Sequence, residues 1–244
     1  MKSRREPGAQ SEGGRNVRPL SMAGRALVAM AVLALLAFAL RETLPEELAP
    51  EPHNGTEEAA EDVRQIDWDS LPESIVAWVE VPGTSIDEPI AQASPENPDY
   101  YLHHDAFGQG AYGTPYIDCD CTPESPFVVV YGHHMSDGSV FADFADFTDR
   151  NYAESHKTIY VYTRHDENRR ELEVQAVDVI DANRELVRTS FNNDDDRAVY
   201  LQESVRKADL ILVSEPSDAS IWAFATCSYQ TRNSRTVIYA SSCL

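Results

Sequence analysis

Short runs of β-branched and other apolar residues, separated by turn signals, fill the chain from residue 75 onward. Pairs such as Pro82-Gly83, Asp137-Gly138 and Asn192-Asn193 are typical of turns between strands. The strand-like runs lie at 75–81, 127–131, 158–163, 172–180, 210–213, 221–226 and 235–240. Many short strands with few helices are typical of an antiparallel barrel or sandwich. We therefore expect a mainly β fold.

Two segments have helical rather than strand-like patterns. They lie at 140–147 and 194–207, and the second begins with acidic residues, which stabilise a helix N-terminus. The sequence contains no repeat of the length that marks a solenoid or propeller. Once its ends are set aside, a chain of 244 residues has room for one domain of ordinary size. The expectation is one mainly β domain with short helices.

An apolar run from Met22 to Leu40, which contains the single charge of Arg25, precedes this domain. A bilayer core requires a helix of roughly 20 residues, so the run is just long enough if Arg25 reaches the interface. Basic side chains come before or at the start of it, at Lys2, Arg4, Arg5, Arg15, Arg18 and Arg25. The positive-inside bias then predicts a cytoplasmic tail at 1–21 and a transmembrane anchor at 22–41, with the remainder exported.

The residues at and after the end of this run leave one alternative and predict a tether. Ala37-Phe38-Ala39 has the form of a cleavage site, so a cleaved signal peptide is the alternative to an anchor. Residues 42–62 are rich in Glu, Pro, Ala and Asn, and they cannot bury enough apolar surface to fold alone. We expect an acidic flexible linker at 42–62 and an extracellular domain at 63–244.

The formal net charge of −21 excludes one class of partner. A protein that binds phosphate backbones needs a concentrated basic surface, and none is visible in this sequence. We therefore expect no nucleic-acid partner. An acidic surface favours solubility and is compatible with an amine-bearing partner, although charge alone does not select one.

A thiol, an imidazole and a guanidinium lie at the ends of predicted strands. Cys227 follows the strand at 221–226, and Arg235 opens the next strand after a short loop. His133 follows the strand at 127–131 and precedes a Ser-Asp-Gly turn. A cysteine and a histidine at strand ends are the minimum for thiol acyl transfer, and a guanidinium beside them can hold an oxyanion. The pattern indicates a thiol acyltransferase or thiol hydrolase.

These motifs resemble those of the class B sortases, a family of cysteine transpeptidases. The segment Tyr131-Gly-His-His-Met-Ser-Asp-Gly-Ser-Val-Phe-Ala142 resembles the histidine motif of that family. Thr226-Cys-Ser-Tyr229 and Arg235 resemble its cysteine and arginine motifs. Ile75 to Thr84, with Ile86 and Pro89, resembles the entry strand, and Asp99-Tyr-Tyr-Leu-His-His104 resembles the next landmark. Together the matches cover about Ile66 to the C-terminus.

The resemblance implies a fold and a reaction. The fold is the sortase-type antiparallel β-barrel, with a helical N-terminal extension near 66–71 and a helix-bearing loop before the cysteine strand. The reaction is cleavage of a C-terminal sorting signal in secreted proteins at a threonyl bond, through a thioacyl intermediate on Cys227. An amine of cell-wall peptidoglycan or of a pilin then receives the acyl group. The resemblance suggests a signal of the Asn-Pro-x-Thr type.

The resemblance also assigns the catalytic roles. A free thiol has a pKa of about 8.5, so a neighbouring cation is needed to hold the thiolate. His133 would protonate the leaving amine and deprotonate the incoming one, and Arg235 would donate to the oxyanion. His134 and Arg232 are the alternatives within the same two motifs. His133 is preferred because it directly follows the glycine, and Arg235 because it leads into the final strand.

The substrate groove is expected beside the nucleophile and along the loop at 181–220, which the family uses as a wall. Thr226 and Ala225 precede the cysteine, and many class B members have Ser where this chain has Ala225. Within the loop, Thr189, Ser190 and Tyr200 are the candidate substrate contacts.

Three further cysteines leave their pairing open. Cys119 or Cys121 can bridge to Cys243 in an exported protein, whereas zinc lacks a fourth ligand at a recognisable spacing. We expect no metal and no cofactor. Two alternatives to transpeptidation remain: a thiol hydrolase with the same residues, and a non-catalytic surface barrel that binds peptide or cell wall.

Overall fold

The computed structural model describes residues 64–108, 112–213, 220–228 and 233–242. The predicted tail, anchor and linker (1–62) lie outside these residues, as do Arg232 and Cys243. Among the residues that are described, no helix has the length and apolar character needed to cross a bilayer.

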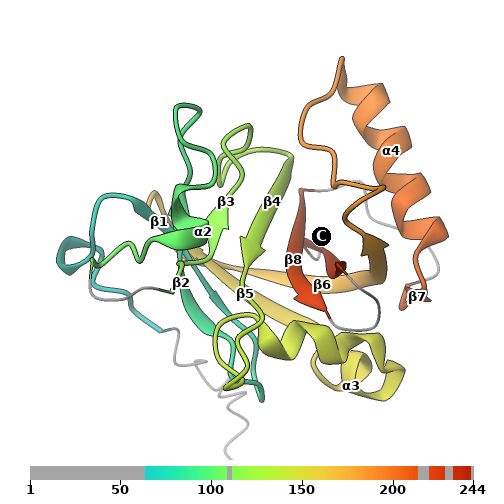
Figure 1. Cartoon of the computed structure of the whole chain (residues 1–244), viewed down its shortest axis with the longest axis horizontal. Helices are drawn as coiled ribbons and strands as arrows, with labels where there is room; N and C mark the ends of the chain where they lie inside the picture. The colour runs from blue at the N-terminus through green and yellow to red at the C-terminus, as the bar shows by residue number, and fades with distance from the viewer. Residues whose placement is uncertain (1–63, 109–111, 214–219, 229–232, 243–244) are drawn as a thin grey trace, which may run out of the picture. The chain divides into compact units, whose positions relative to one another are not determined.

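Eight strands close into a barrel in the order β5-β1-β2-β3-β4-β8-β9-β6, because β6 also pairs with β5 (Figure 1). A ninth strand, β7, adds to the free edge of β6. The strands are β1 (Ile75–Glu80), β2 (Asp87–Gln92), β3 (Tyr116–Ile117), β4 (Phe127–Gly132), β5 (Thr158–Thr163), β6 (Asp166–Asp181), β7 (Leu210–Ile211), β8 (Ile221–Ser228) and β9 (Ser234–Ser242). The helices are η2 (Trp68–Ser70), α2 (Tyr100–His103), η3 (Ala142–Thr148), α3 (Arg150–Ser155) and α4 (Asp194–Lys207).

The expected mainly β barrel is confirmed, but its strands are not all antiparallel. β2 pairs with β3, and β4 with β8, in parallel, while the other pairs are antiparallel. A parallel pair needs a long crossover connection. The chain from 133 to 220 provides it for β4 and β8, and it contains η3, α3, β5, β6, α4 and β7. The expectation of a wholly antiparallel barrel was therefore wrong.

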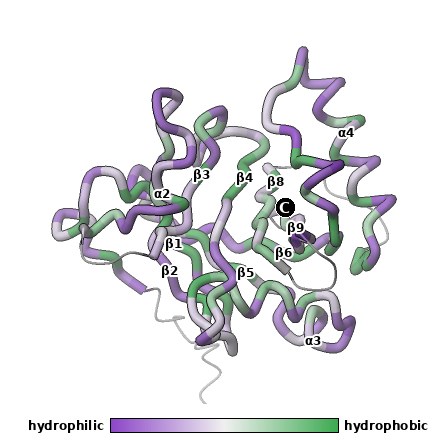
Figure 2. The backbone as a smooth tube through the Cα atoms, viewed as in Figure 1, coloured by the Kyte–Doolittle hydropathy of each residue, from purple (hydrophilic) through white to green (hydrophobic). Residues whose placement is uncertain are grey.

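β4 and β8 are buried on both faces, which explains their nearly continuous apolar sequences (Figure 2). β9 is also buried, with the apolar residues 237–240 between the buried polar residues Thr236 and Ser241. One face, which includes Val128, Trp222 and Ile238, packs into the barrel core. The other face, which includes Val129 and Ala223, packs into a second cluster under α4. The side chains that α4 contributes to that cluster are Leu201 and Val205. The site at the ends of these strands therefore rests on a rigid three-strand platform.

The helices agree in part with the sequence pattern. α4 spans the predicted 194–207, and the segment predicted at 140–147 forms the 3-10 helix η3. The helical extension that the resemblance implied near 66–71 is a single 3-10 turn, η2. β2, β3, α2 and α3 were not predicted as elements. Asp87, Glu88 and Pro89 interrupt the apolar pattern of β2, and β3 is only two residues long.

Gly132, the last residue of β4, permits close packing of the turn that follows it. A Cβ atom at this position would lie 2.2 Å from the ring of Phe141. Phe141 is fully buried and packs edge-on against Phe144 and Phe224, with ring centroids 4.9 and 6.2 Å away. Phe224 belongs to β8, so this aromatic cluster joins the turn after β4 to the strand that carries Cys227.

Gly132→Ala is expected to lower the free energy of unfolding by about 1–3 kcal/mol, because the new methyl group overlaps a ring that cannot move in a filled core. Denaturant unfolding of the purified domain measures this. In a Phe141→Ala background the same change should cost clearly less. An equal cost in both backgrounds would show that the ring is not the cause.

Candidate active site

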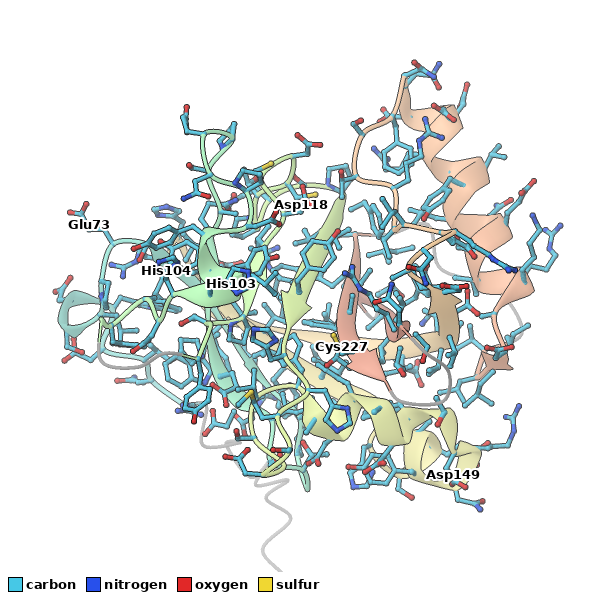
Figure 3. All side chains as sticks on the ribbon, viewed as in Figure 1. Glu73, His103, His104, Asp118, Asp149 and Cys227 are labelled. Carbon is cyan, nitrogen blue, oxygen red and sulfur yellow. The ribbon has the colours of Figure 1, made fainter. Side chains whose placement is uncertain are left out.

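Cys227, His133 and Arg235 line one pocket of about 280 Å³ at the ends of β8, β4 and β9. Cys227 and Arg235 are directly opposite each other in the antiparallel β8–β9 pair. The parallel β4–β8 pair ends at Gly132 and Thr226, the residues that immediately precede the histidine and the cysteine. Strand pairing alone thus brings the three groups together, and Figure 3 shows Cys227 at the end of β8.

The environment of His133 fixes which ring nitrogen carries its hydrogen. Nε2 lies 2.6 Å from the carbonyl oxygen of Leu102 in α2. A carbonyl oxygen only accepts hydrogen bonds, so Nε2 is the donor. In the neutral ring the lone pair is then on Nδ1, and Nδ1 is the atom that can take up a proton. Leu102 had no role in the sequence interpretation.

His134 also reaches the site, by a different contact. Its Nδ1 donates to the main-chain carbonyl oxygen of Cys227 at 3.0 Å. The sequence motif presented the two histidines as alternatives for one role. In the structure each imidazole donates a hydrogen bond to a backbone carbonyl. The acceptor of His133 is in α2, and the acceptor of His134 is in β8.

Arg235 is half-buried, and within the described part of the chain no carboxylate lies within ion-pair distance of its guanidinium. Tyr116 and Tyr131 line the same pocket. Burial raises the pKa of Tyr116 to about 12, with help from Asp99 and against the effect of Arg235. Burial also raises the pKa of Tyr131, whose hydroxyl donates to Asp118. Both phenols are therefore neutral at pH 7, and the guanidinium can bind an oxygen of a ligand.

Comparison with known proteins gives one consistent answer. No family model matches the chain. It is 36% identical over 95 residues to sortase B of Listeria monocytogenes, and 25% identical over 142 residues to sortase B of Staphylococcus aureus. The structure of Clostridium perfringens sortase B superposes with a TM-score of 0.63 and 26% identity, covering 70% of this chain and 94% of that one. The chain is a homologue of the class B sortases.

The sequence matches cover only part of this chain and of each relative. The matches span 38% of this chain and of the Listeria protein, and 57% of this chain and of the Staphylococcus protein. A Staphylococcus aureus sortase B–substrate complex has the same fold, with a TM-score of 0.61 and 24% identity, and covers 70% of this chain and 81% of that one.

Thr226 and Ala225 of this sortase homologue are buried, and both line the pocket. The Oγ1 atom of Thr226 is buried and has no hydrogen-bond partner among the described residues. The hydroxyls of Thr163, Thr236 and Ser241 are buried in the same way, so this feature does not single out Thr226 as a ligand contact. Ala225 provides only a methyl group at its position.

The structure does not bring Thr189, Ser190 and Tyr200 into the pocket of Cys227. Thr189 donates to Asp120 at 3.1 Å and lines a neighbouring pocket of about 220 Å³. The carbonyl of Ser190 and the hydroxyl of Tyr200 each accept a hydrogen bond from Arg188. Leu186 is the residue of the described part of this loop that lines the pocket of Cys227, and it is 69% exposed. The sequence signal that could have identified Leu186 as a pocket residue is its apolar side chain within a largely polar loop.

The two histidines of the 99–104 motif and the cysteines at 119 and 121 do not line the pocket of Cys227. His103 is the last residue of α2 and His104 follows it (Figure 3), and His104 donates to the carbonyl of Tyr100 and stacks on its ring. Cys119 and Cys121 form no disulfide with a described residue, and burial raises the pKa of Cys121 to about 11. The absence of a metal stays a prediction.

A bidentate ion pair holds the loop that carries Leu186. The guanidinium of Arg188 donates to both carboxylate oxygens of Asp196 in α4, at 2.9 and 2.6 Å. These bonds, together with one from the backbone of Asn192, lower the pKa of Asp196 to about 2. The unfolded value is about 3.9, so the charged carboxylate stabilises the fold above about pH 4 and loses this effect as the pH falls toward 2.

Asp196→Asn is therefore expected to lower the thermal unfolding midpoint at pH 7, and to lower it less at about pH 3, where the wild-type carboxylate is losing its advantage. Asp194→Asn is the matched control, because that carboxylate is 89% exposed and its ion pair with Arg197 should contribute little. A difference between Asp196→Asn and wild type that is the same at both pH values would contradict the assignment.

Proposed function

We propose that residues 63–244 form a cysteine transpeptidase that cuts a C-terminal sorting signal of secreted proteins and transfers the acyl part to an amine. The observation that carries the proposal is the single pocket shared by Cys227, His133 and Arg235, which come from three strand ends. The sortase B homologues support the same class of reaction.

In the first half-reaction, the thiol proton of Cys227 passes to Nδ1 of His133, and the sulfur attacks the carbonyl carbon of a threonyl residue. The carbon–nitrogen bond then breaks. His133 gives its proton to the leaving amine, and the threonyl group remains as a thioester on Cys227. The Nδ1 atom is suited to this exchange because Nε2 is already bonded to the carbonyl of Leu102.

In the second half-reaction, an amine attacks the thioester and gives its proton to Nδ1 of His133. The carbon–sulfur bond breaks, an amide forms, and the thiol is restored. Arg235 donates to the oxyanion in both tetrahedral intermediates, and its lack of a carboxylate partner among the described residues leaves its hydrogens available. We propose an amine of cell-wall peptidoglycan or of a pilin as the acceptor.

The cellular setting is part of the proposal. A transmembrane anchor at 22–41 with a cytoplasmic tail at 1–21 would keep the enzyme at the membrane, and the linker at 42–62 would hold the catalytic domain outside the cell. Secreted proteins with a signal of the Asn-Pro-x-Thr type are the proposed substrates. Thr226 and Ala225, which line the pocket, are proposed to contact the signal.

Mass spectrometry of the domain mixed with a small library of signal peptides tests the reaction. Wild type is expected to gain the mass of the threonyl fragment, and Cys227→Ala is expected to gain nothing. Cys119→Ala is the matched control, because it removes a thiol that does not line the pocket. An adduct that persists in Cys227→Ala would defeat the assignment. Product ratios with and without added amine separate transfer from hydrolysis.

Arg235→Lys is expected to lower kcat by about 10²-fold, because an ammonium group cannot reproduce the planar donor pair of a guanidinium. Steady-state kinetics with the same peptides measure this. Arg184→Lys, at a loop position with an 85% exposed side chain, should leave kcat unchanged. Arg232→Lys is the decisive comparison. A loss in that variant, with full activity in Arg235→Lys, would transfer the role to Arg232.

A further inference from the structure

The two consecutive histidines after β4 donate hydrogen bonds to two different backbone carbonyls. Only the acceptor of His134 belongs to Cys227. We propose that His134 is a positioning residue that fixes the carbonyl of Cys227 and, through it, the end of β8 on which the thiol stands. This inference rests on the proposed function, because it concerns the placement of the attacking sulfur.

The pairing of β4 and β8 explains why the cysteine needs such a contact. The parallel ladder between these strands ends at Gly132 and Thr226, and Cys227 is one residue beyond its last pair. There β4 leaves the sheet and enters a turn. On the β4 side, the carbonyl of Cys227 accepts from the imidazole of His134 at 3.0 Å, so a side chain contacts the strand where the ladder has ended.

The turn that carries His134 is itself held in place. The backbone nitrogen of Phe141 donates to the carbonyl of His133 at 2.9 Å, and His134 forms an isolated bridge with Val140. Val140 has a φ of 60°, which is rare for a β-branched residue and indicates a conformation imposed by its surroundings. Phe141 anchors the turn in the aromatic core beside β8. His134 therefore reaches Cys227 from a fixed support.

This contact separates the roles of the two rings. Nδ1 of His134 is engaged as a donor to a carbonyl, whereas in His133 Nε2 is the engaged atom and Nδ1 carries the lone pair of the neutral ring. His133 also lines the pocket that contains Cys227 and Arg235. The geometry therefore assigns proton transfer to His133, and it assigns placement of the Cys227 thiol to His134. Small displacements of a reacting group have large effects on rate, so a contact of this kind affects the chemical step.

The test compares acyl-enzyme formation in His134→Asn, His134→Phe and wild type. Asn keeps a donor near the carbonyl without a ring that can titrate, and Phe keeps a ring without a donor. We expect His134→Phe to form the thioester about tenfold more slowly, the loss expected for one hydrogen bond, and His134→Asn to recover most of the rate. KM should change little, and the pH dependence of kcat/KM should keep its wild-type shape in His134→Asn.

His104→Phe is the matched control, because that ring also donates to a backbone carbonyl, in α2, and it does not line the pocket. Thermal unfolding of every variant identifies a loss of fold. Wild-type rates in a folded His134→Phe would overturn the inference. Equal inactivity of His134→Asn and His134→Phe, with loss of one limb of the pH profile, would instead make His134 the base. If wild type forms no adduct, the proposed function fails, and alkylation rates of Cys227 in the same variants still report on its placement.

Discussion

The hydrogen-bonded contact of β8 with β4 on one side and β9 on the other is the constraint on which the rest of the structure depends. It joins β4, which is far away in the sequence, to the consecutive strands β8 and β9, and it ends at Thr226 on the β4 side of β8 and at Ser228 on the β9 side. His133 and Cys227 directly follow the last β4–β8 pair, and Arg235 pairs with Cys227 one position before the end of the β8–β9 ladder. Because strand registers are discrete, a shift of one residue in either pair would turn one of these side chains to the other face of the sheet.

The packing on both faces of these strands makes that register rigid. The inner face is filled by the barrel core, and the outer face by residues of α4 and its preceding loop. The aromatic cluster of Phe141, Phe144 and Phe224 links the turn after β4 to β8. Gly132 permits this packing because it lacks a side chain. The same turn then supplies two imidazoles whose hydrogen bonds run to α2 and to β8, so packing and catalytic geometry depend on the same few contacts.

The surroundings of Arg235 differ from what the acidic composition of the chain would suggest. The sequence carries 41 acidic residues, yet no carboxylate of the described residues pairs with Arg235. Asp118, which lines the same pocket, accepts the hydroxyl of Tyr131 instead. Although Asp99 and Asp118 line the pocket, the guanidinium of Arg235 has no carboxylate partner among residues that the structure describes, and it can donate to an oxygen with developing negative charge. Such a site is consistent with acyl transfer and would be weakened by a direct ion pair.

The sequence by itself determined the mainly β class, the long helix α4, the order of the motifs and the three residue types of the site. These follow from local patterns, because apolar period, turn residues and strand ends are readable along the chain. Only the tertiary structure decided the two parallel strand pairs, the tautomer of His133, the contact of His134 with Cys227 and the choice of Leu186 rather than Thr189 as a pocket residue. Each of these depends on which distant segments meet. The lengths and spacings in the sequence do not specify these contacts between distant segments. The contacts form because β4, β8 and β9 are buried on both faces at the same time.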